Sequence, residues 1–84
     1  MKAKIYTMTG CPWCVRAKQI LQAKDYQVEE VVLVRGTPEA EVIKQEIKQK
    51  TGVEVRTLPQ IFLGEEYVGG CTDLAKKLGV NLGC

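Results

Sequence analysis

The chain has 84 residues, of which 45% are hydrophobic and 26% are charged. These values are ordinary for a globular protein, and the length suits one domain covering residues 1–84. The net charge of +2 is spread over the chain without a basic run, which argues against a nucleic-acid partner. The longest aliphatic run, Val31 to Val34, is too short for a signal core or a membrane span. Since the chain has four cysteines and no export signal, we expect a reducing compartment, the cytoplasm.

The first half of the chain predicts a strand, a helix and a strand. Residues 2–8 carry apolar or semi-apolar side chains on both sides, which is typical of a central strand covered on both faces. The spacing of Cys14, Ala17 and Leu21 predicts a helix over about residues 12–24. The β-branched stretch in residues 28–34 predicts a second strand, with the run from residue 31 to residue 34 buried. A unit of this length is expected to be right-handed, with parallel strands.

The second half predicts another helix, a hairpin and a short final helix. Thr37 is a good N-cap for a helix over about residues 38–51, and Gly52 ends it. Residues 58–63 and residues 67–68 predict an antiparallel hairpin, because Gly64-Glu65-Glu66 turns the chain back between them. Pro59 stands where the first of these strands begins, a position at which proline is tolerated. The last helix runs to Gly79. The predicted order is therefore β-α-β-α-β-β-α.

The C-x-x-C motif, residues 11–14, lies where the first predicted strand ends and the first predicted helix begins. The sulfur of Cys11 faces unpaired N–H groups of the first helical turn, chiefly those of Trp13 and Cys14, and the positive end of the helix dipole. These interactions stabilise a thiolate, so we expect Cys11 to be ionised near neutral pH and to act as the nucleophile. Cys14 shares the inward stripe of the helix, and we expect it to be the shielded, resolving thiol.

Two structural interpretations of the motif compete with this chemistry. A C-x-x-C can be half of a zinc site, with Cys71 and Cys84 as the other half. The chain has no His and the second pair is far apart, so we expect no metal. A purely structural disulfide between Cys11 and Cys14 is less favoured still, because it would close almost no loop.

Three blocks of sequence together resemble those of one family. They are Gly10-Cys11-Pro12-Trp13-Cys14-Val15-Arg16-Ala17-Lys18, Thr57-Leu58-Pro59-Gln60-Ile61-Phe62 and Gly69-Gly70-Cys71-Thr72-Asp73-Leu74. The family is that of the dithiol glutaredoxins, and the resemblance covers nearly the whole chain. It implies an α/β, thioredoxin-like fold, in which three helices flank a four-stranded mixed sheet.

The resemblance implies an enzyme that uses glutathione to reduce protein disulfides and protein–glutathione mixed disulfides. Cys11 would attack the disulfide, and Cys14 or glutathione would then attack Cys11 and release it. Glutathione is expected as a co-substrate, with no bound cofactor and no membrane partner. The expected partners are proteins that carry disulfides or glutathione. The enzyme itself is expected to be a monomer. Ribonucleotide reductase is a common partner in the family, but nothing in the sequence identifies it.

The resemblance also implies a glutathione site. A cis bond before Pro59 would turn the backbone of Leu58 outward, where it could pair with the peptide-like ligand. First-turn N–H groups near residue 72 would hold the γ-glutamyl carboxylate, and Asp73 would hold the ammonium. Thr72 or Asp73 can also be a plain N-cap of its own helix. The expected contacts are Trp13, Arg56, Thr57, Leu58, Pro59, Gly70, Cys71, Thr72 and Asp73.

The chain departs from the family pattern at three positions. Trp13 replaces the usual tyrosine, and Cys71 is an additional cysteine beside the glutathione site. The segment from residue 8 to residue 10 lacks the Lys or Arg that many members use to hold the glycine carboxylate of glutathione. We expect Arg56 to supply this charge, with Arg16 as its competitor, because a bidentate Arg is the best partner for a carboxylate.

Two other functions use the same motif. Some glutaredoxin-like proteins take electrons from thioredoxin reductase and lack the glutathione-binding blocks, so the block from Gly69 to Asp73 argues against this function. A dimer could instead carry an iron–sulfur cluster through Cys11 and two glutathiones. Pro12 stiffens the active loop and argues against this second function.

Overall fold

The computed structural model describes residues 2–52, 55 and 58–80. Its elements are β1 (Lys2–Met8), α1 (Pro12–Ala23), β2 (Gln27–Leu33), α2 (Pro38–Thr51), β3 (Gln60–Leu63), β4 (Glu66–Gly69) and α3 (Cys71–Leu78). This order confirms the predicted one. The strand expected from residue 58 begins only at residue 60, since Pro59 has no N–H to donate to the sheet. Among the described residues, none of the helices has the length and apolarity needed to cross a membrane.

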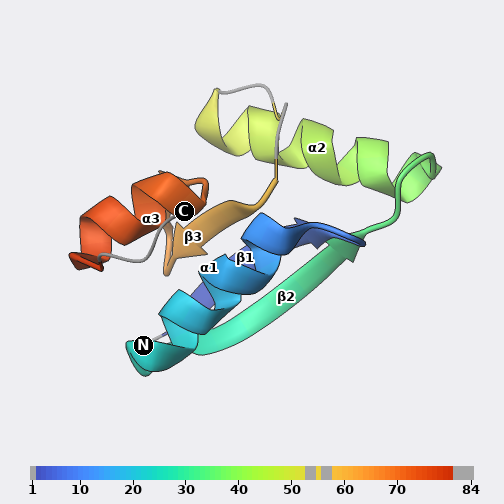
Figure 1. The fold of residues 1–84 in the computed structure, drawn as a ribbon. Coiled ribbons are helices and arrows are strands. Elements are labelled where there is room, and N and C mark those ends of the chain that lie inside the picture. Colours follow the sequence, from blue (N-terminus) through green and yellow to red (C-terminus); the bar gives the residue numbers. More distant parts are fainter. Residues whose placement is uncertain (1, 53–54, 56–57, 81–84) are drawn as a thin grey trace.

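The strands form one mixed sheet in the order β2-β1-β3-β4 (Figure 1). β2 runs parallel to β1, whereas β3 is antiparallel to both β1 and β4. The parallel pair is joined through α1, and the antiparallel pair β3–β4 needs only the tight turn at Gly64. The thioredoxin-like architecture that the resemblance implies is confirmed.

Helices cover both faces of the sheet, with β1 at its centre. On one face Ile5 packs with Leu21 of α1 and Leu74 of α3, all fully buried. On the other face Tyr6 packs with Ile47 of α2. Both sides of β1 are therefore apolar and buried, as its sequence predicts. The C-terminal end of β1 carries the chain directly to the C-x-x-C motif.

The expectation that the whole run from residue 31 to residue 34 is buried is wrong. Leu33 is 1% exposed, but Val32 and Val34 are 47% and 52% exposed. β2 is an edge strand, and successive side chains alternate between the two faces of the sheet. Leu33 therefore joins the cluster under α2, whereas Val32 points to the opposite face, where α1 leaves it exposed.

Candidate active site

Cys11 is the N-cap residue of α1. Its Sγ accepts a hydrogen bond from the backbone N–H of Cys14 at 3.3 Å. Gly10, with φ of 77°, makes the sharp turn that leads from β1 into this position, and Pro12 begins the helix. The sulfur therefore lies at the start of the helix, where its sequence position predicts it.

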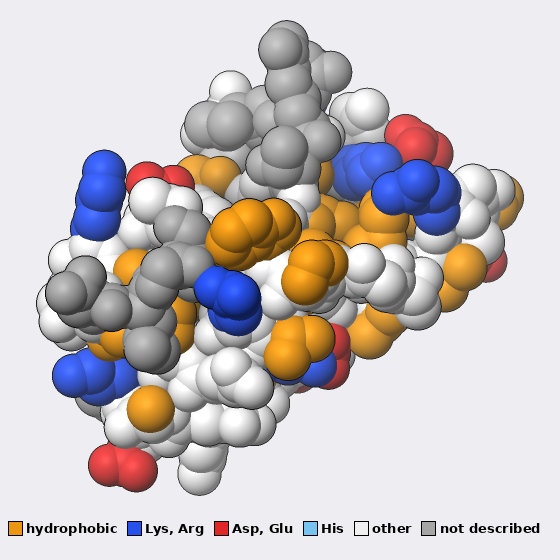
Figure 2. Space-filling model, viewed as in Figure 1, with side chains coloured by type: hydrophobic (Ala, Val, Ile, Leu, Met, Phe, Trp, Pro, Cys, Tyr) orange, Lys and Arg blue, Asp and Glu red, His pale blue; other side chains and the backbone are white. Residues whose placement is uncertain are grey.

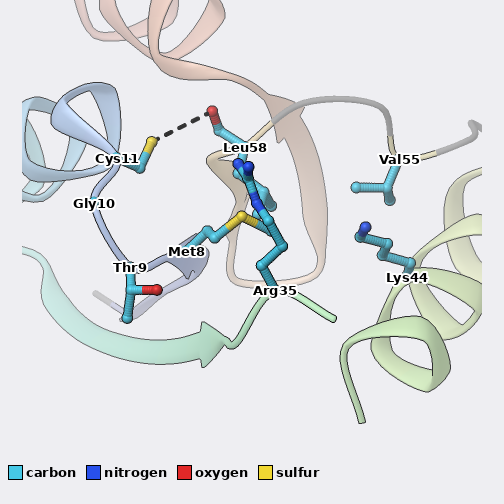
Figure 3. Close-up of a pocket in the computed structure, with 8 residues that line it drawn as sticks. All are labelled: Met8, Thr9, Gly10, Cys11, Arg35, Lys44, Val55 and Leu58. Carbon is cyan, nitrogen blue, oxygen red and sulfur yellow. Dashed lines mark hydrogen bonds between the residues drawn. The ribbon is translucent and has the colours of Figure 1, made fainter. Parts of the chain in front are cut away.

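The Cys11 sulfur also faces the loop that precedes β3. The Cys11 thiol donates to the carbonyl oxygen of Leu58 across 3.7 Å (Figure 3). The Leu58–Pro59 peptide bond is cis, as the resemblance implies. This contact joins two segments that are 47 positions apart in the sequence. It places the backbone of Leu58 beside the reacting sulfur.

Cys14 has a different environment, although it is only three residues away. It is 2% exposed and belongs to the buried stripe of α1. Burial raises the pKa of the Cys14 thiol to about 12, and the Cys11 sulfur and the Glu30 carboxylate add to the rise. Both sulfurs are free thiols here. Cys14 is therefore a neutral thiol at physiological pH, close enough to Cys11 to bond with it after losing its proton.

The start of α3 lies against the segment that contains Pro59. A Cβ placed on Gly70 would lie 3.7 Å from the Pro59 carbonyl oxygen. Asp73 Oδ2 accepts a hydrogen bond from the Gly70 N–H at 3.3 Å. The N-cap of α3 is therefore Gly70, and not Thr72 or Asp73, whereas Asp73 reaches back to this N-cap from the third helical position and remains exposed. Thr72 is exposed as well, whereas Cys71 is 5% exposed and its sulfur is in a disulfide.

A groove of about 440 Å³ opens at Cys11 and is lined by two cationic side chains. Arg35 follows β2, and Lys44 lies on α2. Arg35 reaches toward Leu58, and Lys44 points toward Val55 from the opposite wall (Figure 3). The described residues that line the groove are Met8, Thr9, Gly10, Cys11, Arg35, Lys44, Val55 and Leu58, and none of them is an aspartate or a glutamate. We name this feature the cationic groove.

Sequence reasoning missed Arg35 and Lys44. Arg35 appears only as part of a turn, and α2 has a complete structural explanation in its caps and apolar stripe. Lys44 also lies 3.7 Å from Glu41, one turn earlier on α2, but this pair is exposed and weak. A signal that could have found Arg35 is its place two residues after the end of β2, because the C-terminal ends of parallel strands meet at one edge of a sheet.

Of the two bases expected to hold the glycine carboxylate, the structure describes only Arg16. Arg56 and its neighbour Thr57 lie outside the described residues. The guanidinium of Arg16 lies over the ring of Trp13, 5.4 Å from its centroid, and Trp13 is 47% exposed. Within the described part of the chain, no group of three or more His, Cys, Asp or Glu side chains is placed to hold a metal.

Comparison with known proteins identifies the family. The family model described as Glutaredoxin matches residues 3–68. The glutaredoxin of Pseudomonas aeruginosa is 46% identical over 70 residues, which cover 83% of this chain and 76% of that protein. Glutaredoxin 1 of Escherichia coli is 35% identical over 88 aligned residues, which cover 98% of each chain.

Solved structures agree with this assignment. Glutaredoxin 1 from Francisella tularensis, complexed with cacodylate, superposes with a TM-score of 0.79 at 34% identity, covering 93% of this chain and 92% of that one. The buckwheat glutaredoxin–glutathione complex gives a TM-score of 0.76 at 25% identity, covering 92% of this chain and 67% of that one. The chain belongs to the glutaredoxin family and is a thiol–disulfide oxidoreductase with a thioredoxin-like fold.

Proposed function

We propose that this oxidoreductase takes its electrons from glutathione and reduces protein disulfides and protein–glutathione mixed disulfides. The observation that carries the proposal is the cationic groove, which starts at the Cys11 sulfur and contains Arg35 and Lys44. Glutathione is a peptide-like thiol with a carboxylate at each end. Glutathione bonded to the Cys11 sulfur and lying in this groove would bring one of its terminal carboxylates close to Arg35 and Lys44. The glutathione complex of the buckwheat relative supports the same ligand.

The glycine carboxylate is the part of glutathione that best fits the cationic groove. A guanidinium can bind a carboxylate through two parallel hydrogen bonds, and such charge-assisted bonds are about twice as strong as neutral ones. Arg35 and Lys44 would thus replace the base that is missing before Cys11. Arg16 is less suited, since it stacks on Trp13. Arg56 keeps its predicted role as a further candidate.

The γ-glutamyl end of glutathione would lie at the start of α3. The first-turn N–H groups of Cys71 and Thr72 would donate hydrogen bonds to the γ-glutamyl carboxylate, and Asp73 would pair with the γ-glutamyl ammonium. Gly70 lies close to Pro59, so this helix start and the Leu58 backbone border the same region. Thr57 and Leu58 would supply backbone contacts between the two ends, and the exposed Trp13 ring an apolar face.

The reaction with a glutathionylated protein then proceeds in two exchanges. The Cys11 thiolate attacks the glutathione sulfur, the protein thiolate leaves and takes up a proton, and Cys11 holds glutathione as a mixed disulfide. A second glutathione thiolate attacks that sulfur, which releases glutathione disulfide and restores the Cys11 thiolate. When the substrate is a protein disulfide, Cys14 can carry out the second exchange. The Cys14 thiol loses its proton and attacks the Cys11 sulfur.

The cellular setting is proposed from the same chemistry. Both cysteines of the C-x-x-C pair must be thiols before the reaction, and thiols persist in a reducing compartment, so we place the protein in the cytoplasm. We also propose that it acts as a single-domain monomer. Its partners would be proteins that carry disulfides or glutathione. No described residue selects ribonucleotide reductase among them.

The electron donor can be tested directly. Turnover of a small disulfide is measured with glutathione, glutathione reductase and NADPH, and separately with thioredoxin reductase and NADPH. We expect turnover in the first system and almost none in the second. Turnover with thioredoxin reductase alone would contradict the proposal. Protein purified without oxygen should be colourless, whereas colour would favour the iron–sulfur carrier.

A further inference from the structure

A second groove opens on the other side of the segment from Met8 to Cys11. It has a volume of about 470 Å³ and shares this segment with the cationic groove. Its other walls come from α1 and from the end of β2, whereas the cationic groove lies toward α2. The Cys11 sulfur therefore lies between two grooves, and glutathione would occupy only one of them. We name the second one the valine groove.

The walls of the valine groove are mostly apolar and open to solvent. Val15 of α1 and Val32 of β2 line it and are 49% and 47% exposed. Pro12 and Met8 add further apolar surface beside Cys11. Figure 2 shows hydrophobic side chains over the beginning of α1 and beside the end of β2. Exposed apolar surface gathered around a reactive group is typical of a binding site.

The charges inside the valine groove cancel. Lys18 Nζ lies 3.1 Å from Glu30 Oε2, and the Thr7 hydroxyl donates to the same carboxylate oxygen at 2.7 Å. The Glu30 carboxylate thus already has two partners, which lower its pKa. A ligand in this groove would meet a neutral ion pair, whereas a ligand in the cationic groove would meet two cations. The two grooves therefore suit ligands of different chemistry.

We propose that the valine groove binds the protein substrate, by receiving apolar side chains next to the substrate's disulfide-bonded cysteine. The inference rests on the proposed reduction of protein disulfides, but it does not depend on glutathione as the electron donor. A protein disulfide must reach Cys11, so polypeptide on this side of the sulfur must lie over Val15 and Val32. A second copy of the chain is a poorer occupant, because it would cover the sulfur that has to react.

The chemical step is a pair of exchanges in which the sulfur atoms and electrons balance. The Cys11 thiolate attacks one sulfur of the substrate disulfide, and the other substrate sulfur leaves as a thiolate and takes up a proton. Cys14 loses its proton and attacks Cys11, which closes the Cys11–Cys14 disulfide. The second substrate sulfur is released in this step. The substrate gains two electrons and two protons. Both electrons come from the two enzyme sulfurs, one proton comes from Cys14, and the other comes from the solvent that took the Cys11 proton when the thiolate formed.

The test uses single turnovers of pre-reduced protein without glutathione, so that it does not depend on the electron donor. The probes are two peptides with the same internal disulfide, one with Val and Leu beside its cysteines and one with Ser and Gly. The rate at which dithiothreitol alone reduces each peptide is measured as well, to correct for any difference in intrinsic reactivity between the two disulfides. The variant is Val15→Thr together with Val32→Thr, which keeps the shape of both side chains. The matched control is Val42→Thr, at an exposed valine of α2 that lines neither groove.

We expect wild-type protein to reduce the apolar peptide about tenfold faster than the polar one, in the range that small changes in apolar contact produce. The double variant should lose most of this preference and Val42→Thr should keep it. Both should reduce a small disulfide, bis(2-hydroxyethyl) disulfide, at the wild-type rate, which shows that they are folded and that Cys11 is intact. Equal rates for the two peptides in wild type, or an unchanged preference in the double variant, would overturn the proposal. So would a wild-type dimer in sedimentation that the double variant abolishes.

Discussion

The backbone nitrogen of Cys14 lies 3.3 Å from the Sγ of Cys11 and donates a hydrogen bond to it, while the side chain of Cys14 is buried behind it. Cys14 thus stabilises the Cys11 sulfur with its backbone N–H, while its own sulfur is buried away from solvent. This relationship makes the two thiols unequal before any substrate binds. It is the physical basis for assigning them different roles.

The first prediction concerns these roles. Cys11→Ser should abolish every activity, because no other described thiol is both free and accessible. Cys14→Ser should stop reduction of protein disulfides and leave removal of glutathione from proteins, which needs only one protein thiol. The measurement is activity on a disulfide protein and on a glutathionylated protein. Equal loss of both activities in the two variants would show that the roles are not divided.

The second prediction concerns alkylation of the reduced protein. A short exposure to iodoacetamide at about pH 6 should label Cys11 first. Cys14 should not react, because burial raises the pKa of its thiol to about 12 and iodoacetamide attacks only the thiolate. Peptide mapping by mass spectrometry identifies the labelled cysteine. Labelling that begins at Cys71 or Cys84 would contradict the argument from the helix N-terminus.

The third prediction concerns stability at alkaline pH. The pKa of the Cys14 thiol rises from 9.0 to about 12 on folding, so the folded protein keeps a proton that the unfolded chain releases. This contribution to stability is complete below about pH 9.0 and is lost as the pH rises toward about 12. Between about pH 8 and pH 10 the free energy of unfolding of the reduced protein should fall by about 1 kcal/mol.

Urea unfolding of the reduced protein across this pH range measures the effect, with Cys14→Ala as the control. Other groups titrate in both proteins, so the difference between the two slopes isolates Cys14. The variant should lose less stability than wild type as the pH rises. Parallel curves would mean that the Cys14 thiol is not the group that holds the proton.

The fourth prediction concerns the cationic groove. Arg35→Ala should raise the KM for glutathione several-fold, because an exposed charge-assisted hydrogen bond contributes about 1 kcal/mol. Lys44→Ala should have a smaller effect, since Lys44 also pairs with Glu41. Both effects should shrink at high salt. Steady-state titration with glutathione at fixed salt provides the measurement.

Two further variants decide among the possible bases. Arg16→Ala should leave the KM near the wild-type value, because Arg16 lies over Trp13. Arg56→Ala tests the base expected from the sequence. If the KM rises only in Arg56→Ala, then Arg56 holds the glycine carboxylate. An increase only in Arg16→Ala would instead assign the role to Arg16.

The fifth prediction concerns the two glycines before α3. Gly69 has φ of +115°, and a Cβ there would lie 2.6 Å from Asp73 Oδ2. Gly69→Ala should therefore displace the Asp73 carboxylate and lower the free energy of unfolding by about 1–3 kcal/mol. Gly70→Ala is the matched control, because its Cβ would meet the Pro59 carbonyl oxygen at an ordinary 3.7 Å. Equal stability losses, measured by thermal unfolding, would contradict the close approach at Gly69.

Much of the fold could be predicted because its signals are local. The stripe of Cys14, Ala17 and Leu21 predicts a helix with one buried side, and these residues are 2%, 0% and 0% exposed. The cap residues Thr37 and Gly52 mark the ends of α2 correctly, with Thr37 accepting a hydrogen bond from the backbone of residue 40 and Gly52 in the left-handed region. Such patterns act over a few residues, so the chain order alone reveals them.

The sequence by itself determined the element order and the placement of Cys11 at the start of a helix, because hydrophobic spacing and helix-end chemistry are local. Only the tertiary structure decided which distant residues meet at that sulfur. Arg35 and Lys44 line the groove that opens at Cys11, and they come from a loop and a helix whose own local patterns give no sign of chemistry. Val32 is exposed because β2 lies at the edge of the sheet, and strand order is a property of the whole chain.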